Sequence, residues 1–161
     1  MQRRLREGYL NRLPRELNTY LENQKFITQP ELELVFQKWR TVGENKEESS
    51  NQYFKSSTPW ENEVLGAVSK LPSQHDSQSA LMLIDAEDGA FELQFGWARK
   101  SFGELFKATR TKSLALFRAD FRAGVFVDSY GGEYENNLSP DGVVYELEHW
   151  GFMRRLTSRS S

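Results

Sequence analysis

The chain has 161 residues, 13% aromatic side chains, a formal net charge of −2, a pI near 5.8 and no cysteine. The missing cysteine excludes disulfides, a thiol nucleophile and cysteine–zinc sites. The acidic pI argues against nucleic acid as a partner, and no apolar run approaches the roughly 18 residues that span a bilayer. We therefore expect one domain over residues 1–161 in a bacterial cytoplasm, with its oligomeric state left open.

Helices are predicted in the first part of the chain, about residues 1–71. Three segments carry helix-start signals, either proline in the first turn or a hydroxyl residue followed three positions later by Glu. They are Leu13-Pro14-Arg15-Glu16, Thr28-Gln29-Pro30-Glu31 and Thr58-Pro59-Trp60-Glu61. Between the last two, residues 43–57 are rich in polar residues, and this composition predicts a mobile loop.

Strands are predicted in the second part, about residues 80–157. Leu81-Met82-Leu83-Ile84 precedes the hairpin signal Asp88-Gly89, and residues 91–97 alternate apolar and polar side chains. Residues 125–127 and 143–149 predict further strands, whereas residues 97–124 fit one long helix or a helix followed by a strand. The expected fold class is α+β, with N-terminal helices and a mostly antiparallel sheet of about five strands crossed by one long helix.

Charge is strongly separated along this second part. Residues 97–122 hold seven basic and two acidic side chains, whereas residues 123–153 hold six acidic side chains and no Lys or Arg. In the strand 143–149, Glu146 and Glu148 fall on one face together with Trp150. Burial of unpaired carboxylates costs several kcal/mol each, so this face is expected to meet solvent. The alternative is that the basic segment lies over the acids and neutralises them.

An acidic surface with aromatic side chains is typical of protein recognition. The sequence therefore favours a non-enzymatic binding protein without a cofactor, such as an inhibitor or immunity-type protein, whose partner has a basic surface, for example a nuclease toxin. The predicted partner-binding residues are Asp128, Tyr130, Glu133, Tyr134, Glu135, Glu146, Glu148 and Trp150.

Two short segments resemble a known family. Leu13-Pro14-Arg15-Glu16-Leu17-Asn18-Thr19-Tyr20-Leu21 and Asp141-Gly142-Val143-Val144-Tyr145-Glu146-Leu147-Glu148 are similar to the two ends of SUKH-type domains. The resemblance implies an immunity protein that blocks a toxin, as many bacterial members do. The chain departs from the family pattern in lacking Asn-Gly-Gly after the first helix and in the inserted segment 97–122.

Two other kinds of site stay open as alternatives. Asp85, Asp88 and Glu92 surround the first hairpin, and carboxylates there could hold Mg²⁺ or Ca²⁺ in a metal-dependent hydrolase. A small-ligand pocket could be lined by Phe91, Phe95 and Trp97, although the same residues suit a core. The two histidines are not predicted to be catalytic, because His75 lies in a polar connector and His149 on a strand.

Overall fold

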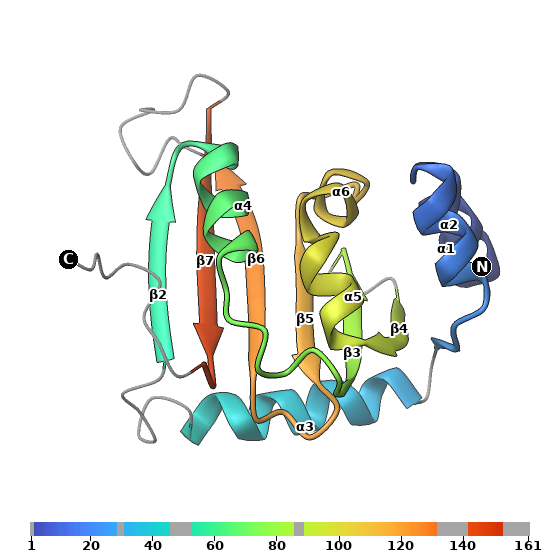
Figure 1. Cartoon of the computed structure of the whole chain (residues 1–161), viewed down its shortest axis with the longest axis horizontal. Coiled ribbons are helices and arrows are strands. Elements are labelled where there is room, and N and C mark those ends of the chain that lie inside the picture. The colour runs from blue at the N-terminus through green and yellow to red at the C-terminus, as the bar shows by residue number, and fades with distance from the viewer. Residues whose placement is uncertain (1, 29–30, 46–52, 86–88, 132–141, 153–161) are drawn as a thin grey trace.

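The computed structural model describes residues 2–28, 31–45, 53–85, 89–131 and 142–152. These residues form a single antiparallel sheet with helices on both of its faces (Figure 1). The fold class is therefore α+β, as the sequence predicts, but the described residues form seven strands rather than about five.

The strands combine segments from the whole length of the chain. In spatial order they run β1-β4-β3-β5-β6-β7-β2, and each neighbouring pair is antiparallel. Their bounds are β1 Phe26–Ile27, β2 Tyr53–Thr58, β3 Ser79–Ile84, β4 Gly89–Gln94, β5 Leu114–Arg118, β6 Gly124–Gly131 and β7 Val143–Trp150. An early strand, β2, thus forms the edge beside the last strand of the sheet.

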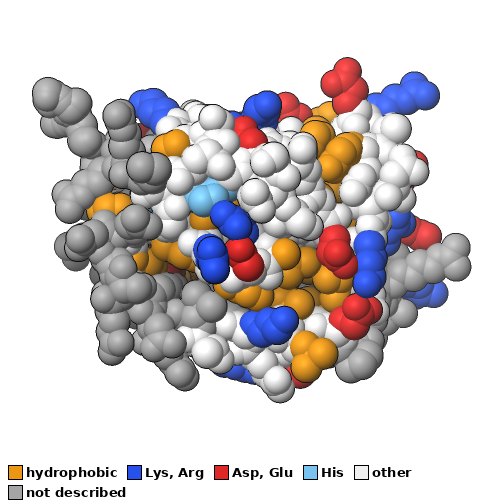
Figure 2. Space-filling view, turned by 60° about the horizontal axis from the view of Figure 1, so that its bottom comes forward, with side chains coloured by type: hydrophobic (Ala, Val, Ile, Leu, Met, Phe, Trp, Pro, Cys, Tyr) orange, Lys and Arg blue, Asp and Glu red, His pale blue; other side chains and the backbone are white. Residues whose placement is uncertain are grey.

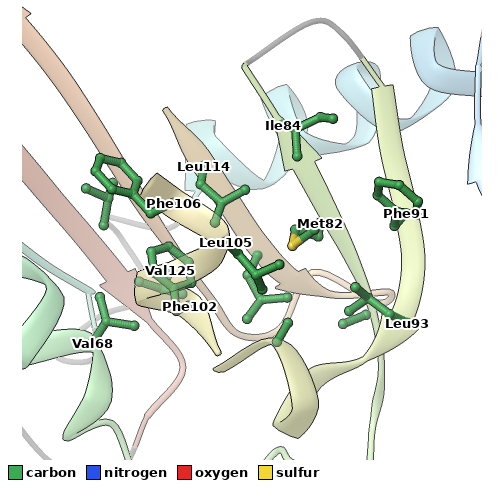
Figure 3. Close-up of a cluster of buried hydrophobic side chains, with 14 of the residues drawn as sticks. Val68, Met82, Ile84, Phe91, Leu93, Phe102, Leu105, Phe106, Leu114 and Val125 are labelled. Carbon is green, nitrogen blue, oxygen red and sulfur yellow. The ribbon is translucent and has the colours of Figure 1, made fainter. Parts of the chain in front are cut away.

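The helices divide unequally between the two faces. Their bounds are α1 Gln2–Asn11, α2 Arg15–Glu22, α3 Glu31–Asn45, α4 Glu61–Ser69, α5 Phe95–Lys100 and α6 Phe102–Lys107. The side chains of α1, α2, α4, α5 and α6 share one buried cluster, whereas those of α3 belong to a second cluster on the opposite face. Figure 3 shows the first cluster, in which Met82 of β3 and Phe91 of β4 lie on the same side as Phe106 of α6, with α3 behind the sheet.

The predicted long helix in residues 97–124 is wrong, and the alternative of a helix followed by a strand is confirmed. Two short helices, α5 and α6, are followed by β5. Leu114–Phe117 is buried on both faces of the sheet, so its side chains give a continuous apolar run. Such a run does not distinguish a buried strand from a buried helix. The strand predicted over residues 91–97 also ends earlier, because α5 begins at Phe95.

The loop predicted over residues 43–57 is wrong at both of its ends. Helix α3 continues to Asn45, and β2 begins at Tyr53, while residues 46–52 lie outside the described residues. Strand β2 was not predicted, because it is an edge strand with only one neighbour in the described sheet. Lys55, Ser56 and Ser57 are exposed, so the apolar alternation typical of a half-buried strand is missing. Helix α1 lies in the part of the chain predicted to be helical, but no start signal identified a separate helix over its residues.

Trp150 and Gly124 form a tight contact at the end of β7. The two residues are paired in register across β6 and β7. A Cβ atom on Gly124 would lie 2.5 Å from the Trp150 ring and 2.8 Å from the Cβ of Phe117. Glycine is therefore needed for this close approach of ring and backbone.

We predict that Gly124→Ala destabilises the protein by about 2 kcal/mol, because the added methyl group overpacks the contact. The matched control is Gly66→Ala in α4, where a Cβ meets nothing within 4 Å. That change should stabilise by up to about 1 kcal/mol through helix propensity. Urea unfolding monitored by circular dichroism measures both, and equal stability of the two variants would contradict the packing argument.

Candidate protein-binding face

Three of the predicted acids lie on one face of the sheet. Asp128 of β6 and Glu146 of β7 are directly opposite one another in the antiparallel register, and Glu148 follows two residues along β7. Tyr145 and Leu147, which alternate with these glutamates along β7, point to the other face, where they join the first buried cluster. All three acids are half-buried and share the α3 face of the sheet.

The edge strand β2 supplies contacts to these acids. The Nζ atom of Lys55 lies 3.6 Å from Glu146 Oε2, and the hydroxyl of Tyr53 donates a hydrogen bond to Glu148. Phe126 is half-buried on the same face, opposite Glu148. We name Tyr53, Lys55, Phe126, Asp128, Tyr130, Glu146 and Glu148 the acidic face.

Five of the seven basic side chains of residues 97–122 form ion pairs with acids that do not belong to the acidic face. Their partners in the described residues are Asp76, Glu61, Asp85 and Asp120. The pairs are Arg99–Asp76 at 2.8 Å, Lys112–Glu61 at 3.4 Å, Arg110–Asp85 at 3.8 Å, Arg118–Asp120 at 2.7 Å and Arg122–Asp120 at 3.9 Å. These ion pairs do not place the basic segment over the acidic face.

Trp150 was predicted as an exposed contact residue, and this prediction is wrong. Its side chain is 5% exposed, and the indole Nε1 donates to the carbonyl oxygen of Phe121 at 3.1 Å. Alternation placed it on the same face as the glutamates, but Leu32 of α3 and the stacked rings of Phe117 and Phe121 pack in the same buried cluster. Tyr130, in contrast, is 36% exposed. Glu133, Tyr134 and Glu135 lie outside the described residues.

The carboxylates of the alternative metal site have separate partners. Asp85 is buried, and its carboxylate accepts hydrogen bonds from the backbone N–H groups of Arg110 at 3.0 Å and Thr111 at 2.7 Å and from the Thr111 hydroxyl at 2.8 Å. Glu92 pairs with Lys25 at 3.4 Å, and Asp88 lies outside the described residues. Over the described ranges, no group of three or more His, Asp or Glu side chains is placed to hold a metal ion.

The aromatic residues of the alternative ligand pocket belong to packed structure. Phe91 and Phe95 are fully buried in the first cluster. Trp97 is half-buried and stacks on Tyr20, with ring centroids 3.8 Å apart. Their contacts are those of core residues.

The polar connector that precedes β3 contains a half-buried carboxylate, Asp76, and a buried imidazole, His75, whose contacts the sequence did not reveal. Asp76 makes a bidentate ion pair with Arg99, with both N–O distances 2.8 Å. The hydrogen bonds from Arg99 lower the pKa of Asp76. His75 is buried and bonds to both Gly151 and Arg118. No local motif predicts these contacts, because the partners lie 23 to 76 residues away in the sequence.

The described residues define an α+β protein in which three half-buried carboxylates share one face of an antiparallel sheet. Its family is shown by comparison: the chain belongs to the YokC prophage protein family, whose model matches residues 1–149. It is 29% identical over 157 residues to the SPbeta prophage-derived uncharacterized protein YokC of Bacillus subtilis (strain 168), a match covering 93% of this chain and 90% of that protein.

No solved structure matches the chain. No helix in the described part of the chain has the length and apolar character required to cross a membrane. The SUKH-type resemblance rests on two short segments, whereas the YokC family model covers most of the chain.

We predict that Asp85→Ala lowers the free energy of unfolding by about 2 kcal/mol, because the two N–H groups lose their acceptor. Asp85→Asn retains an acceptor oxygen and should lose less. Millimolar Mg²⁺, Mn²⁺ or Ca²⁺ should leave the melting temperature of the wild type unchanged. A metal-dependent rise that Asp85→Ala abolishes would instead support the metal site.

We also predict that Asp128→Asn stabilises the protein by a few tenths of a kcal/mol in low salt, because like charges directly opposite on neighbouring strands destabilise a sheet. Asparagine keeps an oxygen that can accept from the Ser129 N–H, as Asp128 does at 2.9 Å. The gain should shrink in 1 M salt, where the Debye length is about 3 Å. A loss of stability at both salt concentrations would show that Asp128 does not repel Glu146.

Proposed function

We propose that this is a cytoplasmic, non-enzymatic protein that binds a basic surface of a protein partner through its acidic face. The observation that carries the proposal is the in-register placement of Asp128 opposite Glu146, with Glu148 two residues away on the same face. Like charges at such positions destabilise the sheet by themselves. A cationic partner offsets this repulsion, so the arrangement suits the bound state better than the free state.

The aromatic members of the acidic face add contact area. Tyr130 is the most exposed of them in the described residues, whereas Tyr53 and Phe126 are half-buried. Tyrosine provides large apolar contact together with a hydroxyl group, and such residues carry much of the energy of protein interfaces. Carboxylates on two adjacent strands can receive the planar fork of an arginine side chain in bidentate hydrogen bonds.

Complementary charge also affects how the complex forms. Attraction between an acidic and a basic surface raises the association rate and disfavours partners of the wrong sign. Attraction between exposed charges is screened by salt. The proposed complex should therefore form rapidly at low ionic strength and weaken as salt is added.

An inhibitor or immunity-type role is the specific form of the proposal. A nuclease must present basic residues along the path of its phosphate backbone substrate. A protein with an acidic, aromatic surface can occupy that path and exclude the substrate. The resemblance of residues 13–21 and 141–148 to SUKH-type domains, many of which are immunity proteins, points in the same direction.

The experiment compares two double variants with the same change in net charge. Asp128→Lys with Glu146→Lys reverses the acidic face, whereas Glu16→Lys with Glu22→Lys reverses two exposed residues of α2. We expect the wild type and the α2 variant to retain the same basic protein from a lysate of the natural host, and the face variant to lose it. Circular dichroism confirms that each variant is folded.

The retained protein is then purified and its affinity measured by calorimetry at two salt concentrations. We expect at least a tenfold weaker affinity for the face variant and a decline with salt for the wild type. Retention of the same protein by all three forms, or an affinity independent of both charge reversal and salt, would overturn the proposal.

A further inference from the structure

The chain makes a tight turn directly after β7. Gly151 has φ +82, and a Cβ atom there would lie 2.2 Å from the carbonyl oxygen of Arg122. The Gly151 carbonyl oxygen lies 2.8 Å from Nε2 of His75. The next residue, Phe152, is fully buried in the first cluster. The end of β7 is thus anchored by one hydrogen bond and one buried ring.

The hydrogen bonds of His75 indicate the roles of its two ring nitrogens. Its Nδ1 lies 3.1 Å from Nη1 of Arg118, and Nη2 of Arg118 binds Asp120 at 2.7 Å. A guanidinium group only donates hydrogen bonds, so Nδ1 must be the acceptor and carry no proton. Nε2 then donates to the Gly151 carbonyl oxygen. Both ring nitrogens of His75 are therefore engaged in hydrogen bonds.

His149, the second histidine of the chain, lies on the other side of the same anchor. It is 5% exposed, its Nδ1 has no hydrogen-bond partner in the described residues, and burial lowers its pKa to about 4. The rings of Phe54 and Phe152 lie 5.2 Å and 6.2 Å from its own, and Val125 is its neighbour in β6. His75 packs edge-on against Phe152 at 5.1 Å.

We propose that His149 forms an acid-sensitive latch, in which its buried imidazole packs against Phe152 and, together with the hydrogen bond between His75 and the Gly151 carbonyl oxygen, holds the end of β7 and the turn after it closed. Protonation of His149 would place a charge between two phenyl rings, where burial disfavours the charged form.

The charged groups around the latch differ between the two histidines. Arg118 of β5 contacts His75 directly, and Asp120 lies behind that arginine. Asp76, next to His75 in the chain, is engaged by Arg99 of α5. The rings and Val125 around His149 carry no charge. In the described part of the chain, the carboxylates near His75 are engaged by arginines, and the residues named around His149 carry no carboxylate.

The direction of the pH effect follows from linkage. The pKa of His149 is lower in the closed form than the ordinary value of 6.5, so the open form binds more protons between these values. The closed form is fully favoured above pH 6.5 and loses this advantage as the pH falls toward 4. Between pH 7 and pH 5, His149 alone should raise the opening equilibrium about 20-fold.

Figure 2 views the molecule with the lower end of Figure 1 turned forward, and it shows a small area of histidine surface beside basic and acidic side chains. His75 and His149 are both buried, with 7% and 5% of their surface exposed. Opening of residues 149–152 would expose Phe152 and Trp150 without requiring β3, β4 and β5 to separate.

Hydrogen–deuterium exchange of the full chain tests the latch, with peptides over β7 and its following turn compared with peptides over β3. Exchange is measured from pH 7 to pH 5 and corrected for the intrinsic pH dependence of amide exchange. We expect the opening equilibrium at the end of β7 to rise about 20-fold or more, while β3 remains protected. Equal changes in the two strands would indicate global destabilisation and would overturn the proposal.

Two variants separate the histidines. His149→Phe keeps an aromatic ring beside Phe54 and Phe152 and should remove most of the pH response. His75→Gln keeps a donor for the Gly151 carbonyl oxygen and is the matched control on the other side of Phe152. The chain has only two histidines, so the double variant should open to the same extent at pH 7 and pH 5. If the double variant does not fold, an unchanged pH response in His149→Phe still contradicts the latch.

Discussion

The pairing register between β6 and β7 is the constraint on which the charge distribution of this protein depends. It places Tyr145 and Leu147 in the core beneath the helices and places Glu146 and Glu148 on the opposite face. A slip of one residue would exchange the two sets. Because each unpaired buried carboxylate costs several kcal/mol, the core and the acidic face reinforce the same register.

The edge strand β2 contributes to this arrangement in two ways. Lys55 pairs with Glu146, and Tyr53 donates a hydrogen bond to Glu148. The strand therefore partly offsets the negative charge of the acidic face. Lysine on an edge strand also discourages pairing with the edge of another sheet. The same side chain thus limits repulsion within the molecule and unwanted association between molecules.

Sequence patterns identified those features that depend on local periodicity. Alternation correctly placed Glu146 and Glu148 on one face, and helix-start signals correctly located α2, α3 and α4. The burial of Trp150 could not be inferred in this way, because its cover comes from α3 and from Phe117 and Phe121. His75 lies among polar residues, yet its partners Arg118 and Gly151 are 43 and 76 positions away. Local composition contains no information about such contacts.

The place of β2 in the sheet has a consequence for how the chain folds. Its neighbour in the described sheet is β7, so residues 53–58 must wait for residues 143–150 before their backbone groups are paired. Pairing between distant segments slows folding, since a long loop must close first. During synthesis, the earlier part of the chain therefore leaves the ribosome before its edge can be completed. The final step of folding is expected to be the joining of the two strands that together display Lys55, Glu146 and Glu148.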